Sequence, residues 1–154
     1  MNARFMKKKF SCRCCNKNDL FPYLDLGSQP LANNYHKGEE LEKYPLKVML
    51  CKNCFHSQLS VVVDSGLMFK NYLYVSGTTE TFRKHCEDLA KDANSRFSKK
   101  LNVLDIACND GTLLYYFKKL GCNVQGVDPA KNLRKITKGK KIPVIVDYWK
   151  KDIA

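Results

Sequence analysis

Two C-x-x-C pairs constrain this chain more than any other feature of its sequence. One pair is Cys12 and Cys15, and the other is Cys51 and Cys54. Each pair can present two thiolates from a tight turn, and four thiolates close a tetrahedron around Zn²⁺ with no open position. The segment that holds them is short and modest in apolar content, so its core alone would give little stability. We therefore expect a structural zinc site whose metal binding is part of the folding free energy.

The spacing leaves alternatives open for the thiols. Cys14 lies inside the first pair and could replace Cys12 or Cys15, although only these two have the two-residue spacing. His56 follows the second pair and could substitute for one thiolate. Buried cysteines without a metal, or a redox-active dithiol, are the other interpretations of such pairs.

The cellular compartment of a protein determines whether its cysteines are reduced or form disulfides. The first ten residues are charged, but no apolar stretch follows them, so no secretory signal is predicted. No run approaches the ~20 apolar residues of a membrane-spanning helix. We expect a cytoplasmic protein without membrane association, in which cysteines stay reduced. Cys86, on the apolar face of a predicted helix, and Cys122, at the start of a predicted strand, are expected in the core.

The formal net charge of +12 arises from 27 Lys and Arg residues against 15 Asp and Glu residues. The surplus is +4, +3 and +5 in residues 1–50, 51–100 and 101–154, so it is evenly spread. A nucleic-acid site usually gathers its basic residues on one face or tail. A Lys-rich solvated surface is therefore favoured over a phosphate-binding patch, and nucleic acid is not expected as a partner.

The first part of the chain alternates short strand-like segments with turns. Residues 21–26, 45–51 and 57–63 are rich in aromatic or β-branched residues, which is typical of strands. Pro and Asn indicate a loop over residues 29–34. These patterns predict an α+β zinc-binding module that spans residues 1–75.

A helix is predicted over residues 79–97, because apolar side chains recur there on one face. Thr78 or Thr79 can cap its start. We expect this helix to link the zinc-binding module to the rest of the chain, as a separate segment over residues 76–100.

From residue 101 the pattern changes to strand, turn, helix and strand. The expected strands are residues 101–107, 122–127 and 142–146. One helix follows Asn109, and another opens at Pro129 or Ala130. This βαβαβ order predicts a parallel sheet, and residues 101–154 are expected to form an incomplete α/β Rossmann-like domain.

The turn after the first of these strands predicts a nucleotide pocket. Asp105 is near the strand end, and Asn109, Asp110 and Gly111 lie where the N–H groups of a helix would face a ligand. Asp128 ends the next strand and could accept hydrogen bonds from ribose hydroxyls. The alternatives are a strand-end turn residue for Asp105 and a helix cap for Asp128.

The number of glycines in this turn indicates which kind of nucleotide the predicted pocket could bind. The full G-x-G-x-x-G pattern is absent, because only Gly111 fits it. This disfavours a pyrophosphate, and with it a dinucleotide-dependent oxidoreductase. A nucleoside without phosphates, such as S-adenosylmethionine (SAM), suits the pattern better. Asp147, after the third strand, could then face the adenine edge.

Six motifs together point to a known family. They are Cys-Arg-Cys-Cys at 12–15; Leu26-Gly27-x-Gln29-Pro30-Leu31-Ala32-Asn33-Asn34; Tyr44-Pro45-Leu46 before Cys51-x-x-Cys54; Gln58-Leu59; Tyr72-x-Tyr74-x-Ser76-Gly77-Thr78-Thr79; and Asp105-Ile106-x-Cys108-Asn109-Asp110-Gly111. From about residue 11 to residue 147, the chain resembles the SAM-dependent sugar C-methyltransferases of deoxysugar biosynthesis. In these enzymes a zinc-binding domain precedes a class I methyltransferase domain.

The resemblance implies zinc on the four paired cysteines and SAM near Asp105–Gly111 and Asp128. It also implies that Tyr72, Tyr74 and the Ser76–Thr79 segment lie close to the sugar and the methyl group. The implied substrate is a nucleotide-linked 4-ketosugar, from which a base removes the proton beside the ketone. The resulting enolate carbon then attacks the methyl group. The chain is thereby expected to be a methyltransferase.

The chain departs from the family pattern in two ways. Ala107 stands where the family usually has Gly, and its small side chain is expected to keep the turn. The chain also holds less than half of a class I methyltransferase sheet, and the family's histidine-bearing catalytic segment has no counterpart. The catalytic base is therefore unknown, with Tyr72 and Tyr74 as possible helpers or merely as core or rim tyrosines.

These departures predict a truncated or split form of the enzyme. A parallel sheet of three strands leaves an open apolar edge. We therefore expect self-association or dependence on a complementary C-terminal polypeptide. The alternative function is a zinc-stabilised basic binding module for nucleic acid or a nucleotide-sugar, without catalysis.

Overall fold

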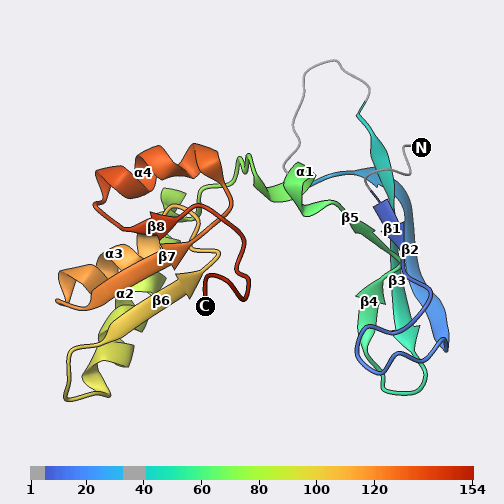
Figure 1. Cartoon of the computed structure of the whole chain (residues 1–154), viewed down its shortest axis with the longest axis horizontal. Coiled ribbons are helices and arrows are strands. Elements are labelled where there is room, and N and C mark those ends of the chain that lie inside the picture. The colour runs from blue at the N-terminus through green and yellow to red at the C-terminus, as the bar shows by residue number, and fades with distance from the viewer. Residues whose placement is uncertain (1–5, 33–40) are drawn as a thin grey trace. The chain divides into compact units, whose positions relative to one another are not determined.

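The computed structural model describes residues 6–32 and 41–154 (Figure 1). The chain divides into two compact units, Met1–Met68 and Phe69–Ala154. The sequence predicts a boundary after residue 75 and a separate linking helix, whereas the structure has the boundary after Met68 and the helix inside the second unit. Asn33 and Asn34, which belong to the expected loop and to one of the six motifs, lie outside the described residues.

The first unit is built from antiparallel strands. Its elements are β1 (Met6–Lys8), β2 (Leu20–Pro30), β3 (Lys43–Cys51), β4 (Ser57–Leu59), β5 (Val61–Val63) and the short helix α1 (Ser65–Phe69), which ends at the first residue of the second unit. β3 lies between β2 and β4, and β1 pairs with β5. The expected strands are present, but residues 57–63 form two strands, β4 and β5. Gln29 and Pro30 continue β2 instead of opening a loop, since Pro is tolerated in an edge strand.

The described part of the first unit buries few side chains. Cys12 and Cys51 are fully buried, and Tyr44 and Val61 are nearly so. Gln58 is the buried polar residue of this unit: its amide accepts a hydrogen bond from Arg13 N (2.8 Å) and donates one to Ser11 O (3.1 Å). The core of this unit is thus centred on cysteines rather than on large apolar residues, as expected for a module that needs a metal.

The second unit contains a parallel sheet in the order β6-β7-β8 with helices, as the βαβαβ pattern predicts (Figure 1). Its strands are β6 (Asn102–Ile106), β7 (Asn123–Val127) and β8 (Val144–Ile145), and its helices are η2 (Ser76–Thr78), α2 (Glu80–Ser95), α3 (Thr112–Lys119), η3 (Lys131–Leu133) and α4 (Arg134–Gly139). The mixed α/β character of the chain is therefore confirmed.

Helix α2 packs against α3 and belongs to the core of the second unit. Thr79 caps its start, because its hydroxyl accepts a hydrogen bond from Phe82 N (3.3 Å). On its apolar face, Ala90 is buried with Phe117 and Cys122. The thiols predicted to be in the core, those of Cys86 and Cys122, are buried, and so is that of Cys108.

The two faces of the parallel sheet differ in exposure. Side chains alternate between the faces of a strand, so Val103 and Val124 pack against the helical clusters, while Leu104 and Ile106 point the other way. Leu104 is 47% exposed, Ile106 49% and Ile145 42%. Among the described helices, none is long and apolar enough to cross a membrane.

Candidate functional site

The four cysteines predicted as metal ligands meet in one cluster. The sulfur atoms of Cys12, Cys15, Cys51 and Cys54 all lie within 4.8 Å of one another. Two of these distances, Cys12 Sγ to Cys54 Sγ and Cys15 Sγ to Cys51 Sγ, are 3.6 Å. A tetrahedron with Zn–S bonds of ~2.3 Å has edges of about 3.8 Å. The cluster is therefore consistent with zinc bound by four thiolates.

Both cysteine pairs sit in turns with the same backbone hydrogen bonds. In each turn, the carbonyl oxygen of the first cysteine accepts a hydrogen bond from the N–H of the residue four positions later. The N–H of the same cysteine donates to the carbonyl oxygen of the residue five positions later. The bonds are Asn16 N to Cys12 O (2.9 Å), Cys12 N to Lys17 O (2.8 Å), Phe55 N to Cys51 O (2.9 Å) and Cys51 N to His56 O (3.0 Å). Asn16 and Phe55 both have a φ of 59°, in the left-handed region. The turns are equivalent, and each brings two thiols to one point.

The thiols of this cluster do not ionise independently. A hydrogen bond from the backbone of Lys17 lowers the pKa of Cys15 to about 6. The backbone of His56 acts in the same direction on Cys54, but burial and hydrogen bonds to the other three thiols outweigh it and raise the pKa of Cys54 to about 12. Four packed thiolates would repel one another, so a divalent cation is the group that allows all of them to be charged.

The alternative ligands weighed from the sequence lie outside this cluster. Cys14 is exposed, and its backbone N–H, not its thiol, approaches the cluster, at 3.4 Å from Cys12 Sγ. The side chain of His56 is exposed, and the metal-binding group found among the described residues consists of the four cysteines alone.

A cavity of about 510 Å³ lies at the carboxyl ends of the parallel strands in the second unit. Aromatic side chains make up much of its wall. They are Phe69, Tyr72, Tyr74, Tyr148 and Trp149. Ala107, Asn109, Asp128 and Asp147, which the sequence predicts as cofactor-binding residues, also line it. The predicted helpers Tyr72 and Tyr74 thus lie in the same cavity as four of the seven predicted cofactor residues.

The other predicted residues lie elsewhere around the same turn. Asp105 and Asp110 line a smaller cavity of about 190 Å³, beside Cys86 and Cys108. Burial, and then the charge of Asp128, raise the pKa of Asp105. Burial also raises the pKa of the Cys108 thiol to about 12, which makes it a poor nucleophile. Gly111 lines neither of these two cavities, and it precedes helix α3 with a φ of +71°.

The turn between β6 and α3 uses three left-handed residues at alternate positions. Ala107 has a φ of 63°, Asn109 of 50° and Gly111 of 71°. The search for a glycine-rich pattern in the sequence identified only the last of these three residues, Gly111. The turn therefore has the backbone of a G-x-G-x-G loop with two glycines replaced, one of them by Asn, the ordinary residue that tolerates this conformation best. An alternating Ala-x-Asn-x-Gly after a buried strand is the signal that could have revealed it.

The left-handed Ala107 leads to a stability prediction. A left-handed conformation costs a residue with a Cβ about 1–2 kcal/mol, whereas glycine adopts it freely and loses only part of this gain through its unfolded-state entropy. We expect Ala107→Gly to raise the free energy of unfolding of the second unit by about 1 kcal/mol. Urea unfolding followed by the fluorescence of Trp149, the only tryptophan of the chain, measures it.

The matched control for this prediction is Ala93→Gly. Ala93 lies within helix α2, where glycine costs up to about 1 kcal/mol relative to alanine. The two Ala→Gly changes should therefore act in opposite directions. A loss of stability in Ala107→Gly as large as that in Ala93→Gly would contradict the assigned strain.

The carboxylates of the larger cavity already have partners within the chain. Asp128 Oδ2 accepts a hydrogen bond from Asn109 N and Oδ1 accepts one from Ala130 N, both at 2.8 Å. Asp128 thus joins the turn after β6 to the turn after β7 and keeps further lone pairs for a ligand. It is not a helix cap, the alternative to ribose binding, because the N-cap of η3 is Ala130 and no side chain caps it. Lys150 lies 2.8 Å from Asp147 Oδ2 and, with the N–H of Tyr148, lowers the pKa of Asp147.

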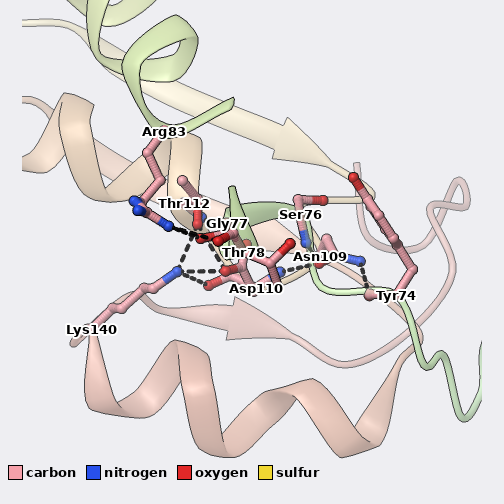
Figure 2. Close-up of polar contacts among 9 residues, drawn as sticks. All are labelled: Tyr74, Ser76, Gly77, Thr78, Arg83, Asn109, Asp110, Thr112 and Lys140. Carbon is pink, nitrogen blue, oxygen red and sulfur yellow. Dashed lines mark hydrogen bonds and ion pairs between the residues drawn. The ribbon is translucent and has the colours of Figure 1, made fainter. Parts of the chain in front are cut away.

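An ion pair between the buried Asp110 and the partly exposed Lys140 fixes the start of helix α3, and the sequence did not indicate it. Asp110 is buried, and Lys140 Nζ donates to Asp110 Oδ2 (2.7 Å), Asp110 O (3.0 Å) and Thr112 Oγ1 (2.7 Å) (Figure 2). Burial alone would raise the pKa of Asp110, but the hydrogen bonds from Lys140 and Thr112 outweigh it and lower this pKa. In the sequence, Lys140 stands between Lys138 and Lys141, and no local pattern pairs it with Asp110.

Comparison with known proteins agrees with this arrangement. Residues 12–69 match a protein family described as "Putative zinc binding domain", and this match holds all four clustered cysteines. The chain is also similar to the C-methyltransferase NovU of Streptomyces niveus, with 30% identity over 142 residues. This alignment covers 87% of the chain and 33% of the relative, so the chain spans about a third of NovU's length. The predicted resemblance to C-methyltransferases with a zinc-binding domain is thereby confirmed.

Proposed function

We propose that this chain is the zinc-binding and SAM-binding portion of a C-methyltransferase that acts on a nucleotide-linked ketosugar. One observation carries the proposal. An aromatic-lined cavity of about 510 Å³ lies at the carboxyl ends of parallel strands, beside a turn with the backbone of a glycine-rich loop. Ligands of open α/β sheets bind at this edge. The similarity to a C-methyltransferase supports the same proposal.

The residues of the cavity fit an adenosyl ligand. Phe69, Tyr148 and Trp149 offer flat apolar surfaces of the kind on which an adenine ring stacks. The hydroxyl of Tyr148 is buried and has no hydrogen-bond partner within the described part of the chain. A buried hydroxyl without a partner is costly, and a polar group of a ligand would satisfy it only after this side chain turns toward the cavity.

The acidic residues of the cavity complete this fit. Asp128 and Asp147 supply carboxylate oxygens for ribose hydroxyls and for the adenine edge. Both are acceptors, and none of the described residues that line the cavity is basic, which suits a nucleoside better than a phosphate.

The chemistry of the proposed reaction assigns different roles to the residues present. Bound SAM would supply an electrophilic methyl group. Tyr72 and Tyr74 share the cavity and are proposed as helpers that orient the sugar, while the catalytic base stays unknown. The aromatic wall would exclude water from the reacting groups. The zinc cluster lies in the other unit and is proposed as purely structural, because four thiolates leave no open position.

The expected partners and the expected compartment stay predictions. They are a nucleotide-sugar substrate, self-association or a complementary C-terminal polypeptide, and a cytoplasmic location. The uncovered face of the sheet, with Leu104, Ile106 and Ile145, is the surface that such a polypeptide would cover.

Calorimetric titration of the zinc-loaded chain tests the proposal. We expect SAM and S-adenosylhomocysteine to bind and to change the fluorescence of Trp149, which lines the cavity. ATP and NAD⁺ are the controls, since they carry adenine together with phosphates and should not bind. Heat from neither adenosyl compound would refute the SAM assignment. Salt-sensitive binding to a random oligonucleotide would instead favour the basic binding module.

A further inference from the structure

One wall of the larger cavity is a segment without regular secondary structure for most of its length. We call residues 69–77 the strap. Tyr72, Tyr74 and Ser76 of the strap line the cavity, whereas Leu73 and Val75, between them, do not. Alternate residues facing one side are the mark of extended backbone. The strap pairs with none of the described strands, so its backbone groups need other partners.

Asn132 of η3 supplies two of these partners. Its Oδ1 accepts a hydrogen bond from Tyr72 N (3.0 Å), and its Nδ2 donates to Tyr72 O (2.8 Å). The neighbouring Lys131 N donates to Lys70 O (3.1 Å). One amide side chain thus binds both the N–H and the C=O of a single residue, in the way that a neighbouring strand would.

Asn109 repeats this arrangement further along the strap. Its Nδ2 donates to Tyr74 O (3.1 Å), and its Oδ1 accepts from Ser76 N (2.9 Å), as Figure 2 shows. Asn109 itself belongs to the left-handed turn after β6, so this contact joins the strap to the turn. Two asparagines therefore hold three successive inward-facing residues of the strap.

The far end of the strap is fixed by close packing at Gly77. A Cβ at Gly77 would lie 2.2 Å from Thr112 Oγ1 and 2.7 Å from Asp110 Oδ2, closer than any side chain can approach. Arg83 Nη1 donates to Gly77 O (2.8 Å) and to Thr78 O (3.0 Å). In Figure 2 this end of the strap lies against Thr112 and Asp110. This end is held by side-chain volume as well as by hydrogen bonds.

The anchors differ in strength along the strap. Gly77 packs against Thr112 and the buried carboxylate of Asp110, whereas the two hydrogen bonds between the Tyr72 backbone and Asn132 are exposed. Backbone hydrogen bonds exposed to solvent open more readily than buried ones. At the Tyr72 end of the strap, the side chain of Asn132 supplies two exposed hydrogen bonds, next to the bond from Lys131 N to Lys70 O.

We propose that Asn132 is a positioning residue that holds the strap in place as the wall of the ligand cavity. The amide sets the position of Tyr72, and through it that of the aromatic wall, without touching the ligand. Pre-organising a wall removes an ordering cost from binding. Loss of the two hydrogen bonds between Asn132 and Tyr72 should therefore weaken ligand affinity. This inference rests on the proposed function, in which the cavity binds an adenosyl ligand.

The test compares Asn132→Leu with Asn123→Leu in the full zinc-loaded chain. Leucine has a similar size but can form neither hydrogen bond to Tyr72. Asn123 is the control, because it is an exposed asparagine whose amide pairs with Asn102 at the opposite end of the sheet. Hydrogen exchange of the Tyr72 amide is measured without ligand, and the affinity for S-adenosylhomocysteine is measured by calorimetry.

We expect Asn132→Leu to speed exchange at Tyr72 by at least about tenfold and to weaken binding by about tenfold, with an unchanged midpoint of global unfolding. Asn123→Leu should change neither. Unchanged hydrogen exchange at Tyr72 in Asn132→Leu would refute the proposal that Asn132 holds the strap. Faster exchange with unchanged affinity would refute the proposal that this contact supports ligand binding. If the unmodified chain binds no adenosyl ligand, the proposed function fails and with it the role in binding, while exchange at Tyr72 still decides whether Asn132 holds the strap.

Discussion

Removing zinc is expected to unfold the first unit of this chain and to leave the second unit folded. The described residues of the first unit bury little besides two of the clustered cysteines, so few apolar contacts remain when the metal leaves. In zinc-finger peptides the metal contributes on the order of 10–16 kcal/mol at pH 7, which exceeds the whole stability of a small domain. Helices α2, α3 and α4 and the parallel sheet belong to the other unit and lack this dependence.

Two substitutions distinguish the loss of a zinc ligand from the effect of replacing any cysteine in this unit. Cys51→Ser removes a buried ligand, and we expect loss of stoichiometric zinc and of dispersed amide signals from residues 12–32 and 41–63. Cys14→Ser changes an exposed thiol in the same turn as Cys12 and Cys15, and should keep the metal. Metal content, the absorption of the Co²⁺-substituted chain and two-dimensional NMR measure these outcomes. Loss of zinc in Cys14→Ser, or a chelator-treated chain with unchanged spectra, would contradict the assigned ligands.

Local patterns in the sequence predicted the parts of this structure that local patterns determine. The two-residue spacing of the cysteine pairs predicted the ligands, because a tight turn joins the two thiols of each pair. Apolar periodicity predicted helix α2, and the order of strands and helices predicted the parallel sheet. The similarity of residues 12–69 to a zinc-binding family agrees with the first of these.

The interactions that the sequence did not reveal join residues that are distant along the chain. Asn132 binds Tyr72 across 60 residues, and Lys140 binds Asp110 across 30, and neither pair has a local signature. Ala107 was singled out as the residue in place of a family Gly, but its left-handed backbone was not predicted, because the turn between β6 and α3 sets it, whereas alanine ordinarily favours a helix. Long-range polar pairs and conformations imposed by the fold therefore had to come from the structure.

Replacing Lys140 by Met is expected to lower the free energy of unfolding of the second unit by about 3 kcal/mol. Its partner Asp110 is buried, with a side chain that is only 3% exposed, and the lysine donates to three oxygens of this network. Methionine fills similar space but leaves the carboxylate buried without its cation, which is the costly way to break a buried ion pair. Urea unfolding followed by Trp149 fluorescence measures the loss.

The pH dependence of this loss distinguishes a missing charge from a packing defect. In the unmodified chain the pKa of Asp110 is lowered, so its contribution is present above the unfolded-state value of about 4 and is lost as the pH falls through the lower, folded value. In Lys140→Met the buried carboxyl should instead have a raised pKa, and its protonation on acidification should relieve part of the penalty. The stability difference between the two proteins should therefore shrink from pH 7 towards pH 5. Lys138→Met, which changes an exposed lysine two residues before Lys140, is the control and should cost little at any pH. A difference that stays constant with pH would show that Lys140 acts through packing alone.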